Sequence, residues 1–195
     1  MPRMRGGRRF GRTMHLAAAF ALSACAAGIK QEYDPELDRR ITRMSGNVVT
    51  EQVCLVEHSL ELNGAIVEEA GGTTYMLSAQ SSGPAYVRPR SLVLRIDGDA
   101  LTLDEPLPQS AAASCPDDSG TNTNLPMGGK PPACVYMEAY WFRVTPETIR
   151  RLADASEVVV ELQGEEGTIQ RRFTPPNFEK FQEFVALHVP PGYGS

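Results

Sequence analysis

Short runs of β-branched and aliphatic residues, each closed by a turn signal, dominate the middle of the chain. Asn63-Gly64 and Asp97-Gly98 are the dipeptides that two-residue hairpin turns favour, because both central residues of such a turn need positive φ. Each dipeptide therefore predicts a tight β-hairpin between the runs on either side of it. The runs that we interpret as strands cover residues 48–62, 65–69, 73–80, 91–96 and 100–103.

The last third of the chain combines strands with two capped helices. Thr145-Pro146 and Thr174-Pro175 each place threonine at an N-cap and proline at the first helical position. Apolar residues at helical spacing follow both pairs, with Phe178, Phe181 and Phe184 in the second helix. Strands are predicted at 135–144, 158–162 and 168–173.

Two segments have a different character. Residues 25–46 predict a tether followed by a short helix, because Asp34-Pro35-Glu36 is an N-terminal capping pattern and Leu37, Ile41 and Met44 have helical spacing. Residues 109–132 contain almost no large apolar side chain and show no periodicity. Such a long segment indicates either a flexible surface insertion or a binding loop.

These elements predict an α+β fold. Hairpin connections imply antiparallel pairing, and helices gathered in the C-terminal half imply a layer of helices against a sheet. We expect an antiparallel sheet, curved or sandwich-like, with the last helix packed on one sheet face by its phenylalanines. The single α+β domain would span residues 47–190.

The N-terminus has the organisation of a secretory signal peptide. Five arginines precede a short apolar run, Leu16 to Leu22, which is far shorter than the roughly 20 residues of a membrane-spanning helix. Leu22-Ser23-Ala24-Cys25 then resembles the lipobox of bacterial lipoproteins. The resemblance implies removal of residues 1–24 and acylation of Cys25, hence anchoring to the membrane by covalent lipid, in the outer membrane if the source is Gram-negative. Plain secretion after cleavage among the small residues is the alternative.

The charge of the mature chain limits the kinds of partner. The signal carries five of the 19 basic residues and none of the 24 acidic residues, so the mature chain has a net charge of −10. Nucleic acids and anionic lipid headgroups bind concentrated Lys and Arg, so a nucleic-acid partner is not expected.

Three cysteines remain if Cys25 carries lipid. An oxidising envelope would favour one disulfide, and the predicted pair is Cys115 with Cys134, which bracket the 109–132 segment. Cys54 lies in a strand-like run and is interpreted as a small buried residue.

No recognised catalytic pattern accompanies these features. The serines lack a Gly-x-Ser-x-Gly frame, no His/Cys cluster has zinc spacing, and no glycine-rich phosphate loop is present, so neither a metal nor another cofactor is predicted. The aromatic strand at 135–144 is the candidate binding surface, because Tyr140 and Trp141 are residue types enriched at interfaces. Trp141 is expected on the face opposite to Tyr136, Tyr140 and Phe142.

Three functional hypotheses follow. The first is a lipid-anchored envelope protein whose domain binds or scaffolds a protein or cell-wall partner without catalysis. The second is an envelope hydrolase whose site is assembled from distant residues, including His58. The third is an inhibitor that acts through the 109–132 loop.

Overall fold

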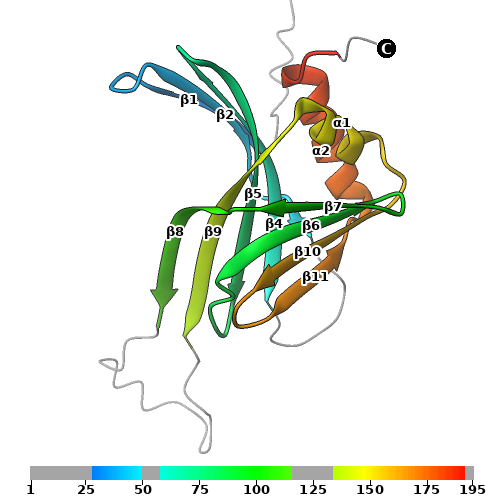
Figure 1. Ribbon diagram of the computed structural model, residues 1–195. Helices are drawn as coiled ribbons and strands as arrows, with labels where there is room; N and C mark the ends of the chain where they lie inside the picture. The colour runs from blue at the N-terminus through cyan, green and yellow to red at the C-terminus, as the bar shows by residue number, and fades with distance from the viewer. Residues whose placement is uncertain (1–27, 50–57, 116–133, 192–195) are drawn as a thin grey trace, which may run out of the picture.

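Two antiparallel sheets and two helices make up the parts of the chain that the computed structural model describes, residues 28–49, 58–115 and 134–191 (Figure 1). The larger sheet has the spatial strand order β1-β2-β4-β5-β9-β8, with the short β3 paired to β4, and the smaller sheet has the order β11-β10-β6-β7. The strands of the larger sheet are β1 (Ile29–Asp34), β2 (Arg39–Met44), β3 (Val48–Val49), β4 (Ser59–Glu69), β5 (Gly72–Gly83), β8 (Leu107–Ser114) and β9 (Val135–Val144). Those of the smaller sheet are β6 (Pro89–Ile96), β7 (Asp99–Asp104), β10 (Val158–Gly164) and β11 (Thr168–Arg172).

Both predicted helices are present and begin where their caps indicate. In α1 (Pro146–Asp154), the Thr145 hydroxyl accepts a hydrogen bond from the Thr148 amide at 3.2 Å. In α2 (Pro175–His188), the Asn177 side-chain oxygen accepts from both the amide and the hydroxyl of Thr174 at 2.8 Å. These bonds satisfy polar groups that the first turn of a helix otherwise leaves unpaired.

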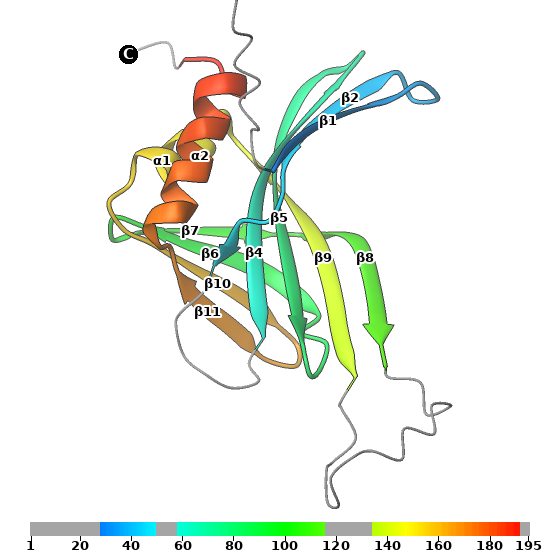
Figure 2. The same ribbon diagram turned by 180° about the vertical axis from the view of Figure 1, so that it is seen from behind.

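The core lies between the larger sheet and a layer made of the smaller sheet and the helices (Figures 1 and 2). Phe142 from β9 and Phe181 and Phe184 from α2 are fully buried in it. The Phe184 ring packs against β4, so α2 lies on a face of the larger sheet. The structure thus confirms the predicted α+β fold, with a curved antiparallel sheet and two helices in the C-terminal half.

One predicted hairpin is confirmed and the other is wrong. Asp97 and Gly98 join β6 to β7 with φ of 50° and 92°, as a tight turn requires. Asn63 and Gly64 instead lie inside β4, and Gly64 pairs with Leu77 of β5. A Cβ on Gly64 would lie 2.9 Å from Cε1 of Phe184, so this glycine makes room for an aromatic ring rather than for a turn.

The helix and most of the tether predicted within 25–46 are also wrong, because residues 29–44 form the β1–β2 hairpin. The Asp34 carboxylate accepts bonds from the Glu36 and Leu37 amides at 3.1 and 3.3 Å, so the capping pattern starts a turn. Strand β2 then pairs with β4, which places Ile41 opposite Val67. These strand-to-strand bonds replace the helical bonds that the spacing suggested.

The segment predicted as an insertion at 109–132 begins as ordered sheet. Residues up to Ser114 belong to β8, which pairs with β9. Every residue of β8 is exposed, so the strand is held by its backbone bonds to β9 and needs no apolar alternation. The remainder of the predicted insertion from 116 to 132 lies outside the described residues, as do Cys25, Cys54 and the signal peptide.

Candidate functional site

The larger sheet is hollowed on the face that the helices do not cover. In both views the helices and the smaller sheet lie on one side of it, while the β1–β2 hairpin and β8 bend toward the other (Figures 1 and 2). The hollow has a volume of about 510 Å³, and we call it the open trough. Its lining residues are Arg39, Ile41, Arg43, Val67, Glu69, Thr74, Met76, Leu107, Pro108, Gln109, Trp141 and Arg143.

The strand register explains why these residues meet. Directly paired residues of neighbouring strands share a face, and the pairs run from Arg43 through Ala65 and Met76 to Arg143. Two arginines therefore stand at the ends of one row, with apolar residues between them. The next row of the same face runs from Asn63 through Ser78 to Trp141 and then Leu107.

The cations of the open trough differ in their ion pairs. Arg39 is bound to Asp34 at 3.2 Å and Arg43 to Glu32 at 2.7 Å, both acids of the edge strand β1. Arg143 is exposed and makes no ion pair among the described residues. Arg143 is therefore the trough cation whose charge is available to a ligand.

Ser78 is a buried polar residue on this face, only 6% exposed. Within the described residues its hydroxyl has no hydrogen-bond partner, and it lies opposite Trp141 in the register. An unpaired buried hydroxyl costs free energy, of order 1–3 kcal/mol. A polar group that reached this hydroxyl would recover part of that cost.

The two aromatic residues predicted as a binding surface lie on opposite faces of β9, which separates them. Trp141 is half-buried and lines the open trough. Tyr140 faces a second cleft of about 760 Å³ at the junction of the two sheets. Alternation along a strand requires this separation, so the structure brings Trp141, and not Tyr140, together with the trough arginines.

Tyr140 belongs to a structural contact around Glu138. The buried Glu138 carboxylate accepts bonds from the Val87 and Arg88 amides at 2.5 and 3.2 Å, and the Tyr140 hydroxyl donates to it at 3.4 Å. Burial and the neighbouring Glu138 charge raise the pKa of Tyr140. The contact ties β9 to the segment before β6, where Arg88 has a φ of 53°.

Among the side chains that the structure describes, His58 has none of the hydrogen-bonded partners that a hydrolytic site requires. Its ring packs over Gly83, where a Cβ would lie 2.2 Å from Nδ1, and burial lowers its pKa. Across residues 28–49, 58–115 and 134–191, Nδ1 has no hydrogen-bond partner. The nearby Ser59 and Ser82 hydroxyls bond to each other at 2.6 Å instead of to the imidazole.

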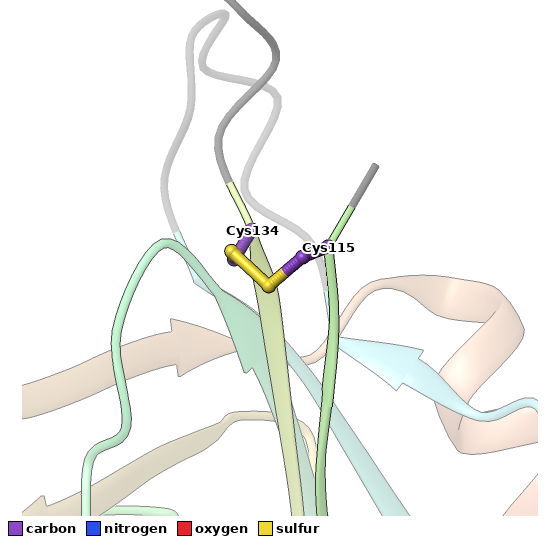
Figure 3. Close-up of a disulfide and its surroundings, with 2 residues drawn as sticks. All are labelled: Cys115 and Cys134. Carbon is purple, nitrogen blue, oxygen red and sulfur yellow. A yellow bond between two sulfur atoms is a disulfide. The ribbon is translucent and has the colours of Figure 1, made fainter. Parts of the chain in front are cut away.

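The predicted disulfide between Cys115 and Cys134 is confirmed (Figure 3). Cys115 immediately follows Ser114 and Cys134 immediately precedes Val135, the last β8–β9 pair, and the Cα atoms of the two cysteines are 4.1 Å apart. The bond therefore fastens the end of β8 to its only neighbouring strand in the described sheet.

Strand β8 differs in its charge from the end strands β1, β7 and β11 of the two sheets. It has no charged residue in Leu107–Ser114, whereas β1, at the opposite edge of the same sheet, carries Lys30, Glu32 and Asp34. The edges of the smaller sheet, β7 and β11, also carry charged residues. Charges usually protect an edge strand from pairing with other chains, and the other uncharged edge strand, β3, has only 2 residues against 8 in β8, so β8 is the edge among the described strands best able to accept one.

Sequence reasoning missed both the trough and the edge. Arg143 could have been found, because it lies two residues after Trp141 on the same strand and so on the same face. The uncharged run at 110–114 was visible, but a strand without apolar alternation is indistinguishable from a loop in the sequence.

Residues 28–49, 58–115 and 134–191 contain neither a candidate membrane span nor a candidate metal site. Neither helix there has the length and apolar character needed to cross a bilayer, and no group of three or more His, Cys, Asp or Glu side chains could hold a metal ion.

Comparisons of the chain with protein-family models, curated proteins and solved structures found no match.

Proposed function

We propose that this chain is a lipid-anchored protein of the bacterial cell envelope whose domain binds a partner protein without catalysis. The anchor in this proposal is Cys25, supported by the lipobox-like Leu22-Ser23-Ala24-Cys25 after a basic and apolar signal. The binding mode is the addition of an extended strand from the partner to β8.

The uncharged edge at β8 carries the proposal. Its eight residues are exposed and mostly small, so a second strand can approach without like-charge repulsion or bulky obstruction. The register with β9 is interrupted between Pro108 and Ser110 and continuous from Ser110 to Ser114. The segment that can accept a partner strand is therefore 110–114, and the disulfide holds its far end in place.

The anchor is tested by the N-terminal mass of the protein purified from membranes, beside a Cys25→Ala variant. We expect cleavage before Cys25 and added acyl mass, both lost in the variant. An unmodified Cys25 in protein recovered from the soluble fraction would refute the anchor.

Strand addition is tested by photo-crosslinking in the source cells, with a photoreactive residue at Ala112 of β8. We expect a discrete adduct that disappears when Ala111 and Ala113 are both changed to Lys, because the added charges oppose pairing. The matched control is the same photoreactive residue at Leu37, exposed in the β1–β2 turn. Equal adducts at both positions, or an adduct insensitive to the lysines, would contradict binding at β8.

A further inference from the structure

We infer that the open trough is a binding site for a single-chain amphiphile with a carboxylate headgroup, that is, a fatty acid. This site includes residues 107–109 at the start of β8 but not the 110–114 segment proposed for strand pairing, and it does not depend on that pairing. The inference rests on the side chains of the trough, the state of its backbone groups, and the arrangement of its arginines.

The lining favours a hydrocarbon chain. Apolar side chains from five strands contribute to it, namely Ile41, Val67, Met76, Trp141 and Leu107. Strands β2, β4 and β5 each lie between two paired strands, so their ladder donors and acceptors are used, and β9 is paired with β5 through Val144 and with β8 as far as Trp141. A peptide laid across them would bury its own amides without partners, whereas a hydrocarbon chain has no amides to satisfy.

The charges favour an anionic headgroup at one end. Glu69 is the acidic side chain in the lining, on the last residue of β4, and lies on the same side of the trough as Arg39. Arg143 lies in a different row, next to Trp141, and has no ion pair among the described residues. A carboxylate therefore meets an available guanidinium at Arg143 and avoids the Glu69 charge.

The dimensions and the floor fit one small ligand. A volume of about 510 Å³ lies within the range of sites for single small molecules, ~300–1,000 Å³. On the same face of the sheet, the Ser78 hydroxyl, which has no hydrogen-bond partner among the described residues, lies opposite Trp141 in the register. The carboxylate is the one group of a fatty acid that can accept a hydrogen bond from this hydroxyl, and Trp141 lies between Ser78, with which it pairs, and Arg143 on this face, so ligand binding should change the surroundings of the indole ring.

Trp141 makes the inference directly measurable, because it is the single tryptophan of the chain. The purified full-length protein is titrated with dodecanoate below its micelle concentration while the Trp141 fluorescence is recorded. Dodecanol, of the same chain length and without charge, is titrated in parallel, as is a short acidic peptide. We expect a saturable change with dodecanoate, weaker binding of dodecanol, and no change with the peptide.

Variants then assign the binding to the trough. Arg143→Ala should weaken dodecanoate binding by about tenfold and leave dodecanol unaffected. Val67→Glu, at a half-exposed position of the lining, should abolish both. The matched control is Arg40→Ala, which removes the same charge from the opposite face of β2, where Arg40 is exposed and pairs with Glu68. Circular dichroism verifies that each variant is folded.

Three results would overturn the inference. They are the absence of a saturable change with dodecanoate, equal binding to Arg143→Ala and native protein, and binding of the acidic peptide as strong as that of the fatty acid. The crosslinking experiment at β8 does not depend on any of these results. If the trough does not bind a fatty acid, the proposed partner binding at β8 is therefore unaffected.

Discussion

Gly64 gives a prediction that tests how α2 packs on the larger sheet. A Cβ at this position would lie 2.9 Å from Cε1 and 3.1 Å from Cδ1 of Phe184, and 3.2 Å from Sδ of Met44. Phe184 is fully buried and Met44 is 4% exposed, so neither side chain can move into solvent. The change Gly64→Ala should therefore overpack the core.

The size of the effect follows from two opposing terms. Forcing one extra carbon into a well-packed core costs about 1–3 kcal/mol. Replacing glycine by alanine also reduces the conformational entropy of the unfolded chain, which stabilises the folded state by roughly 0.4–1 kcal/mol. We expect a net loss of about 1–2 kcal/mol in the free energy of unfolding, or a melting temperature lower by roughly 2–8 °C.

Urea unfolding followed by circular dichroism measures this loss. The control is Gly71→Ala, since nothing lies within 4 Å of a Cβ at Gly71 and its φ is not positive. The variant Phe184→Leu supplies the second half of a double-mutant cycle, because a smaller side chain should accommodate the new methyl group. Gly64→Ala as stable as the native protein, or strictly additive with Phe184→Leu, would refute the proposed packing.

Two further predictions concern the disulfide and His58. Replacing both Cys115 and Cys134 by Ser should lower the free energy of unfolding by about 3 kcal/mol on the chain-entropy model, because the bond closes a loop with a sequence separation of 19. Urea unfolding measures it, and an unchanged midpoint would contradict the estimate. Burial lowers the pKa of His58 in the folded protein below its usual value of 6.5. The unfolded chain then binds the proton first, so stability should be complete above pH 6.5 and decline as the pH falls from 6.5 through the folded pKa. An NMR titration midpoint at or above 6.5, or the same decline in His58→Gln, would show that this histidine is not responsible.

Local sequence signals identified the parts of the fold that are determined by residues close together in the sequence. The caps at Thr145 and Thr174 and the turn at Asp97-Gly98 act within three or four residues, so they could be found without knowledge of the rest of the chain. The aromatic strand at 135–144 was also clear, because its composition and length are typical of β structure.

The errors arose where a distant element decided the outcome. Asn63-Gly64 has turn chemistry, but the ring that fills the space beside Gly64 comes from Phe184, 120 residues later. The capping pattern at Asp34 fits a helix equally well as a turn, and pairing of β2 with β4 selected the turn. Tertiary packing overrides local propensity in both cases.

The candidate site, too, could be predicted only in part from local sequence patterns. Trp141 could be selected as a residue type suited to binding, and Arg143 follows from strand alternation. Ile41, Val67 and Met76 join them only because β2, β4, β5 and β9 are neighbours in that order, which no short-range pattern encodes.

The position of β1 in the sequence limits how far the domain can lie from a lipid anchor at Cys25. Ile29 is already in the sheet, and only four residue steps separate it from Cys25. Even a fully extended backbone spans at most about 14 Å in four steps. If Cys25 carries the lipid, the short linker between Cys25 and Ile29 keeps the folded domain close to the membrane. Its partner must come to the membrane surface, and lengthening the linker before Ile29 would change which molecules the domain can reach.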